Sequence, residues 1–174
     1  KMIKHICNEC LFGIEANKRT SRIARINMYL HGDGGSHIFH GDGLEETPKA
    51  TIDMNDEEAS ETTDHAKTVK NDNFDLVLSN PPFSMNYQRS KDEDKRIIDQ
   101  FDFTLGKSSV KSSVLFLNRY EKLLKKGGEM LIVLDDTILN GKSYEDLREW
   151  ILDRFVLLGV HSLPFNTFLK AKAN

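Results

Sequence analysis

The chain has 174 residues, of which 39% are hydrophobic, and a formal net charge of −3. This length suits one domain with a buried core, so a chain that is disordered throughout is excluded. The slightly negative charge argues against a freestanding basic DNA-binding module. No apolar run approaches the ~18 residues of a membrane helix, and the N-terminus lacks the apolar centre of a signal peptide. We therefore expect a cytoplasmic protein without membrane segments.

Short apolar runs alternate with helical patterns along the chain. Strands are expected at Leu11–Glu15, His37–Asp42, Phe74–Leu78, Glu129–Leu134 and Leu157–Leu163. Helices are expected from the N-cap Asn17 to Leu30, from Ser112 or Ser113 to Lys126 before the stop at Gly127-Gly128, and from Ser143 to Phe155. Strands that alternate with helices predict an α/β fold with a mostly parallel sheet.

Helical spacing also places apolar side chains on common faces of the expected helices. Ile23, Ile26 and Leu30 fall on one face of the first expected helix. Leu147, Ile151 and Leu152 are expected to face inward from the last one.

Two long polar segments interrupt this alternation. An acidic loop is expected at about residues 45–72, and its stretch from Asp53 to Asp64 has six carboxylates and no basic side chain. A variable, polar loop is expected at about residues 84–111.

Cys7 and Cys10 form a single CxxC pair close to His5. These side chains supply three potential zinc ligands, whereas a structural zinc site needs four. We expect two reduced thiols and no metal site.

Four polar side chains follow the ends of expected strands: Glu15, Asp42, Asn80 and Asp135. Ligands of parallel α/β sheets bind at the carboxyl ends of the strands, so these side chains are expected to gather on one rim. Taken singly, Glu15 and Asp42 also fit a plain role as caps of the following turn or helix.

The segment Asn80-Pro81-Pro82-Phe83 carries the strongest chemical signal. Proline lacks an amide hydrogen and stiffens the backbone, so the segment presents a rigid pair of acceptors, the Asn80 amide oxygen and the Pro81 carbonyl. Phe83 adds a ring for stacking. Such a rim suits a planar ring that carries an NH2 group, although an ordinary Asn-Pro turn after a strand has the same letters.

SNPPF directly after FDLVL resembles the catalytic motif of S-adenosylmethionine-dependent methyltransferases that act on amino groups. The segments LFGIEANKRTSRIARINMYLHGDG, HGDGL, KKGGEMLIVLDD and HSLPFNTF narrow the match. Together they resemble the modification (methylase) subunit of type I restriction–modification systems, a family of adenine-N6 DNA methyltransferases. The resemblance covers most of the chain except the acidic loop and residues 84–111.

The resemblance implies a cofactor, S-adenosylmethionine, and residues that bind it. Glu15 matches the acidic residue that accepts hydrogen bonds from the cofactor ribose, and Asp42 matches the acidic residue near the cofactor adenine. Gly13, Ile14 and Gly43 are expected to shape the wall of the cofactor site.

The resemblance also implies catalytic roles within Asn80-Pro81-Pro82-Phe83. Asn80 and the Pro81 carbonyl match the acceptors of the target adenine's amino group, and Phe83 matches the ring that stacks on that base. Because a duplex adenine is out of reach, the base is expected to flip into the site.

The implied fold is a Rossmann-like methyltransferase sheet with helices on both faces. Its first strand with the glycine-rich cofactor loop, and its last strand, have no counterpart in residues 1–174. We therefore expect a partial methyltransferase catalytic domain that is inactive by itself.

The implied partners are double-stranded DNA, a specificity subunit and a restriction subunit. The basic segment Lys107–Lys126 fits either a DNA path or an ordinary solvated helix face. Two other functions stay open: methylation of RNA or of a protein glutamine on the same fold, and a non-catalytic nucleotide-binding or assembly module.

Overall fold

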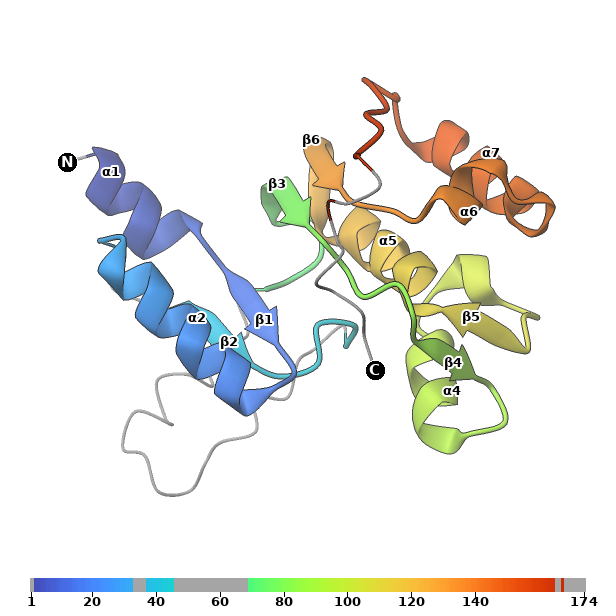
Figure 1. Cartoon of the computed structure of the whole chain (residues 1–174), viewed down its shortest axis with the longest axis horizontal. Coiled ribbons are helices and arrows are strands. Elements are labelled where there is room, and N and C mark those ends of the chain that lie inside the picture. The colour runs from blue at the N-terminus through green and yellow to red at the C-terminus, as the bar shows by residue number, and fades with distance from the viewer. Residues whose placement is uncertain (1, 33–36, 46–68, 165–166, 168–174) are drawn as a thin grey trace. The chain divides into compact units, whose positions relative to one another are not determined.

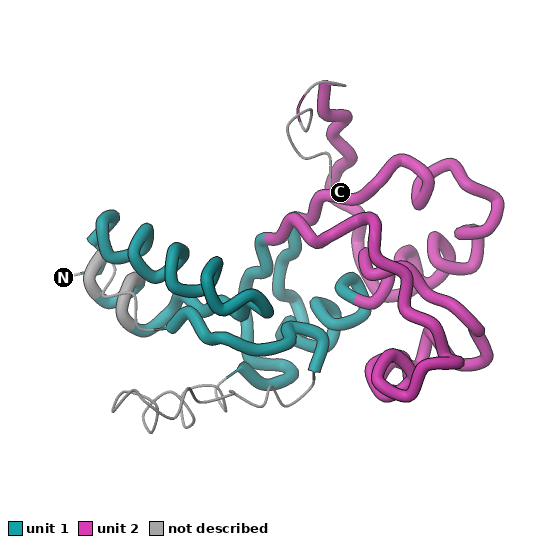
Figure 2. Tube along the Cα trace, turned by 60° about the horizontal axis from the view of Figure 1, so that its bottom comes forward, with its two compact units in different colours: residues 1–78, 116–131 teal, residues 79–115, 132–174 magenta. Residues whose placement is uncertain are grey.

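A computed structural model describes residues 2–32, 37–45, 69–164 and 167. The chain divides into two compact units, which Figure 2 colours separately. The first unit comprises Lys1–Leu78 and Phe116–Leu131, and the second comprises Ser79–Leu115 and Ile132–Asn174. Most of the expected acidic loop lies outside the described residues. Across the described ranges, no helix is both long and apolar enough to span a membrane.

The elements are labelled in chain order in Figure 1. From the N-terminus to Ser79 the elements are α1 (Met2–His5), a π-helical turn (Ile6–Cys10), β1 (Gly13–Glu15), α2 (Lys18–Leu30), β2 (Ile38–His40) and β3 (Phe74–Ser79). The remaining elements, in chain order, are β4 (Asn86–Gln88), α4 (Asp92–Ile98), a 3₁₀ turn (Asp102–Thr104), β5 (Ser109–Lys111), α5 (Ser112–Leu123), β6 (Leu124–Ile132), α6 (Asp136–Asn140), a 3₁₀ turn (Lys142–Tyr144) and α7 (Glu145–Arg154).

The described strands pair into three two-stranded sheets: β1 with β2, β3 with β6, and β4 with β5. The pair β1–β2 is parallel, whereas β4–β5 is antiparallel. The mixed α/β class is therefore confirmed. The hydrogen bonds of the described residues do not join these pairs into the single sheet that was expected.

The first unit contains a strand–helix–strand motif. Gly13, Ile14 and Glu15 of β1 lie opposite Ile38, Phe39 and His40 of β2. Helix α2 connects β1 to β2 in the chain and packs against both strands (Figure 1). This helix begins where predicted, because the Asn17 side chain accepts a hydrogen bond from the Thr20 N–H at 3.1 Å.

The shared apolar face of α2 does not enter the core. Ile23, Ile26 and Leu30 are exposed, and the buried residue of this helix is Ser21. The core of the first unit forms instead around Phe39 of β2 and Val69. The side chains that pack against these two are Phe12, Ile14, Phe74 and Leu123.

Residues 84–111 are not the irregular loop that was expected. They form the β4–β5 pair, α4 and a 3₁₀ turn. The apolar residues are sparse in this segment, but Ile97, Ile98, Phe101 and Val110 are all buried. Each of these elements is short and contributes few buried side chains. The sequence therefore contains no apolar pattern long enough to indicate a helix or a strand there.

The expected end of α5 at Gly127-Gly128 is also wrong. The helix ends at Leu123, because its carbonyls at Lys122 and Leu123 accept backbone N–H groups from Asp72 and Asn73. Strand β6 then starts at Leu124 and includes both glycines. A side chain at Gly128 would lie 3.2 Å from the Asp75 carbonyl of β3, so glycine allows the two backbones to approach closely.

The C-terminal part differs from expectation in two ways. Helix α7 begins at Glu145, and it buries Leu147 and half-buries Ile151 but leaves Leu152 exposed. No strand forms at Leu157–Leu163, and most of its apolar side chains are exposed. A strand requires a partner for its backbone groups, and none of the described strands pairs with this segment.

Candidate active site

The predicted cofactor residues lie together in the first unit, at the carboxyl ends of the adjacent strands β1 and β2. The Gly41 N–H donates to the Glu15 carbonyl at 3.1 Å, which joins the two chain segments just beyond the paired residues. Glu15 and Asp42 therefore share one edge of this parallel pair, as predicted for these two.

Both carboxylates use one oxygen to hold their own turn. Glu15 Oε1 accepts the Asn17 N–H at 2.7 Å, and Asp42 Oδ1 accepts the Leu44 N–H at 2.9 Å. The capping role left open from sequence is thus real. Within the described part of the chain, the second oxygen of each carboxylate has no hydrogen-bond partner. Each group remains able to accept a further hydrogen bond, such as one from a ribose hydroxyl.

The remaining cofactor candidates belong to the same two strand ends. Gly13 and Ile14 are half-buried in β1, and a side chain at Gly13 would lie 2.8 Å from the Ile38 side chain. The Gly43 carbonyl accepts a hydrogen bond from Arg119 Nε of α5 at 3.4 Å. The loop after β2 is therefore attached to a helix far away in sequence.

The predicted catalytic segment lies in the second unit, directly after β3. Pro81 is buried, Phe83 is half-buried, and Asn80 and Pro82 are exposed. Among the described residues, neither the Asn80 side chain nor the Pro81 carbonyl takes part in a hydrogen bond. Both predicted acceptors are thus available to an incoming donor.

The start of α5 holds this segment, which the sequence did not reveal. Ser112 Oγ donates to the Pro82 carbonyl at 2.6 Å, and the Ser112 N–H donates to the Met85 carbonyl at 2.8 Å. The next residue, Ser113, donates to Asp135 Oδ2 at 3.5 Å. The only sequence signal of these serines was their place at an expected helix start.

Asp135, at the end of the neighbouring strand, lies in a polar cluster of the second unit. The Val133 N–H donates to the Ser79 carbonyl at 3.0 Å, so the chain leaves β3 and β6 side by side. Asp135 accepts a hydrogen bond from Thr137 and lies 3.5 Å from Lys111 Nζ. The prediction that Glu15 and Asp42 share one rim with Asn80 and Asp135 stays a prediction, because the two pairs belong to different units.

Three lysines of the basic segment Lys107–Lys126 form ion pairs with carboxylates. Lys107 pairs with Asp146, Lys111 with Asp135, and Lys125 with Asp75. These lysines are already partly neutralised by neighbouring carboxylates. Arg119, which was grouped with them from sequence, is fully buried.

Arg119 acts inside the first unit. Besides Gly43, its guanidinium binds the Asn71 side-chain oxygen at 2.7 Å. The next two residues, Asp72 and Asn73, are further held by the last carbonyls of α5. Arg119 therefore attaches the loop after β2 and the segment before β3 to one helix.

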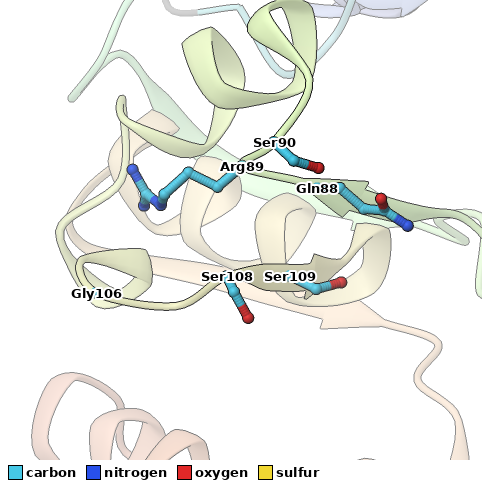
Figure 3. A pocket seen from close by; sticks show the side chains of 6 residues that line it. All are labelled: Gln88, Arg89, Ser90, Gly106, Ser108 and Ser109. Carbon is cyan, nitrogen blue, oxygen red and sulfur yellow. The ribbon is translucent and has the colours of Figure 1, made fainter.

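Two other features contribute no predicted site residue. Cys10 Sγ lies 3.9 Å from His5 Nε2, and no group of metal-binding side chains occurs among the described residues. An open pocket of about 560 Å³ in the second unit is lined by Gln88, Arg89, Ser90, Gly106, Ser108 and Ser109 (Figure 3). Arg89 donates there to the Lys107 and Thr104 carbonyls and pairs with Asp99, so its guanidinium is committed within the protein.

Comparisons with known proteins identify the family of this chain. The family model described as N-6 DNA Methylase matches residues 2–174. The chain is similar to "Defense against restriction protein B" of Escherichia phage P1, with 29% identity over 103 residues, or 59% of this chain. The match spans only 4% of the length of that relative. No solved structure matches the chain. Because the family model matches nearly the whole sequence, the chain belongs to the N-6 DNA methylase family.

Proposed function

We propose that this chain carries the catalytic motif of a site-specific DNA adenine-N6 methyltransferase that uses S-adenosylmethionine. The observation that carries the proposal is the pair of acceptors at Asn80 and Pro81. They lie beside Phe83, immediately after β3, and have no hydrogen-bond partner among the described residues. Membership in the N-6 DNA methylase family supports the same reaction.

The chemistry of an aromatic amine explains why two acceptors suffice. The exocyclic nitrogen of adenine is a poor nucleophile, because its lone pair is delocalised into the ring. Asn80 Oδ1 and the Pro81 carbonyl accept its two hydrogens, which favours a pyramidal nitrogen and stabilises the positive charge that develops during transfer. The new N–C bond forms as the methyl–sulfur bond breaks, and one proton then leaves the nitrogen for solvent. Phe83 stacks on the flipped base and keeps it in place.

The cofactor supplies an electrophilic methyl group when it is bound. The acceptors at the ends of β1 and β2 fit it, since Glu15 and Asp42 each retain one carboxylate oxygen for a hydroxyl or amine donor. In this proposal Glu15 binds the ribose hydroxyls and Asp42 lies near the cofactor adenine. Gly13, Ile14 and Gly43 form the wall of that site.

The Rossmann-like sheet belongs to the proposal as well. The parallel β1–β2 pair with the crossover helix α2 is the strand–helix–strand unit of which such sheets are built. Phe74 of β3 packs against the core below this pair, within the first unit.

We further propose that the protein acts as the modification subunit of a type I restriction–modification system in the cytoplasm. Its partners are then double-stranded DNA, a specificity subunit that reads the target sequence, and a restriction subunit. Support comes from the sequence resemblance over the α2 segment and the Asn80–Phe83 motif.

A second candidate is a methyltransferase that protects DNA without a specificity subunit. The phage relative favours it, since its name concerns defence against restriction. Co-purification separates the two: a DNA-reading partner subunit favours the type I system, and full activity without any partner favours the second candidate.

The test uses the protein as its source organism encodes it, with any sequence that flanks these residues and with its co-purifying partners. It is expressed in a host that lacks adenine methylation, and N6-methyladenine in DNA and RNA is measured by mass spectrometry. Asn80→Ala should lower DNA methylation by about 10²–10³-fold, because a preorganised acceptor is lost. Binding of S-adenosylmethionine, measured by calorimetry, should be largely unchanged.

Asn140→Ala is the matched control, because Asn140 is an exposed asparagine at the end of α6. Equal loss of methylation and of cofactor binding in Asn80→Ala would contradict the assigned role. Methylation of RNA alone would favour the other acceptor class, and cofactor binding without any methyl transfer would favour the non-catalytic module.

A further inference from the structure

Ser112 connects the Asn80–Phe83 motif to the start of α5, and its environment is unusual for a serine. The residue is fully buried, at the first position of a 12-residue helix. Its hydroxyl donates to the Pro82 carbonyl at 2.6 Å. Its backbone N–H donates to the Met85 carbonyl at 2.8 Å. One residue therefore makes two hydrogen bonds to the segment that contains the motif.

The direction of these bonds agrees with the electrostatics of a helix start. The first N–H groups of a helix have no partner inside the helix and carry partial positive charge. The carbonyls of Pro82 and Met85 supply negative oxygen atoms at this position. The carbonyls of the motif segment therefore accept hydrogen bonds from the start of α5, where the partial positive charge favours acceptors.

The prolines stiffen the motif internally, but they have no N–H groups that could attach it to the rest of the protein. Its position therefore depends on contacts such as the one with Ser112. Neither Pro81 nor Pro82 has an N–H, so both can be held only through their carbonyls or their rings. The bond to the Pro82 carbonyl fixes the peptide plane between Pro82 and Phe83. It leaves the Pro81 carbonyl available to substrate.

We propose that Ser112 is a positioning residue for methyl transfer, which acts through the Pro82 carbonyl to fix the Pro81 acceptor and the Phe83 ring. This inference rests on the proposed function of the motif. Ser112 itself touches no substrate. Its neighbour Ser113 makes a longer bond of 3.5 Å to Asp135, and this bond holds the adjacent strand end rather than the motif.

A positioning role predicts a larger effect on turnover than on stability. One buried hydrogen bond contributes roughly 0.5–1.5 kcal/mol to folding. Misplacing a reacting group by about 1 Å can cost ~10²-fold in rate. Ser112→Ala should therefore lower kcat by about 10-fold to 100-fold. KM for S-adenosylmethionine should be unchanged, because the proposed cofactor ligands Glu15 and Asp42 belong to the other unit.

The experiment compares four variants in the protein as its source organism encodes it, with any flanking sequence and any co-purifying partners. Methyl transfer is followed with radiolabelled S-adenosylmethionine on DNA from a host that lacks adenine methylation. Ser112→Ala removes the donor, Ser112→Cys keeps the size with a weak donor, and Ser112→Thr keeps the hydroxyl. Ser143→Ala is the matched control, since Ser143 is an exposed serine in the same unit.

Low kcat in Ser112→Ala and Ser112→Cys, with recovery in Ser112→Thr and wild-type behaviour in Ser143→Ala, is the expected result. Equal kcat in Ser112→Ala and wild type would overturn the inference, and so would loss of folding in both donor-deficient variants. Those outcomes leave the proposed function standing as long as the wild type methylates DNA adenine. A wild type that methylates no DNA would refute the proposed function instead.

Discussion

Replacing Arg119 by methionine should lower the free energy of unfolding, although the sequence places Arg119 in a basic segment. The side chain is fully buried and donates to Asn71 at 2.7 Å and to Gly43 at 3.4 Å. Methionine preserves a flexible apolar stem in the same space, so the substitution isolates the contribution of the guanidinium.

The magnitude follows from these two bonds. A hydrogen bond from a charged donor contributes roughly 1.5–3 kcal/mol, and the 3.4 Å bond to Gly43 counts only weakly. Relief of the desolvation of the buried guanidinium offsets part of the loss. We therefore expect Arg119→Met to lower the free energy of unfolding by about 2 kcal/mol.

Urea unfolding followed by circular dichroism measures this loss, with Lys126→Met as the control. Lys126 belongs to the same segment but is exposed, and its replacement should change stability by less than about 0.5 kcal/mol. Amide exchange at Leu44 should also accelerate in Arg119→Met, because the loop after β2 loses its attachment to α5. Equal unfolding midpoints and slopes in the two variants would refute the reasoning from burial.

Two further predictions concern stability. Asn17→Ala should lower the free energy of unfolding by about 1 kcal/mol, because the Thr20 N–H loses its capping acceptor. Thermal unfolding measures this loss, and an unchanged midpoint would contradict the prediction. Lys107 lowers the pKa of Asp146 below its ordinary 3.8, first through a hydrogen bond and then through its charge. The pair therefore stabilises the folded state above about pH 3.8, and the stabilisation disappears as pH falls through the lowered folded-state pKa. Asp146→Asn should lower the free energy of unfolding by roughly 0.2–1 kcal/mol at pH 7, since the pair is partly exposed to solvent. The unfolding of wild type and variant is measured across pH, and a difference in stability that persisted in acid would refute the role of the ion pair.

Local signals in the sequence were sufficient for several parts of the site. Asn17 caps α2, Glu15 is the last residue of β1, and Asp42 follows β2. Each of these features depends on bonds to residues two or three positions away, such as Glu15 to Asn17. Such bonds depend on neighbouring residue types, and a sequence displays those directly.

The errors came from features that depend on distant partners. The helix α5 ends at Leu123 rather than at Lys126, because residues 72 and 73 cap its last carbonyls. The segment at Leu157–Leu163 has the composition of a strand but no pairing partner among the described strands. Composition and spacing report neither the presence nor the absence of such a partner.

By itself the sequence determined the α/β class. It also singled out the candidate acceptors at Asn80 and Pro81 and the carboxylates at the ends of the first two strands. Only the tertiary structure decided which side chains support them. Ser112 acts on Pro82 across 30 positions of sequence, and Arg119 acts on Gly43 across 76. A sequence does not show whether a serine at a helix start, or an arginine in a basic segment, is solvated or buried. Burial and the distant carbonyl they meet are properties of the folded chain, and these turn both residues into supports of the candidate site.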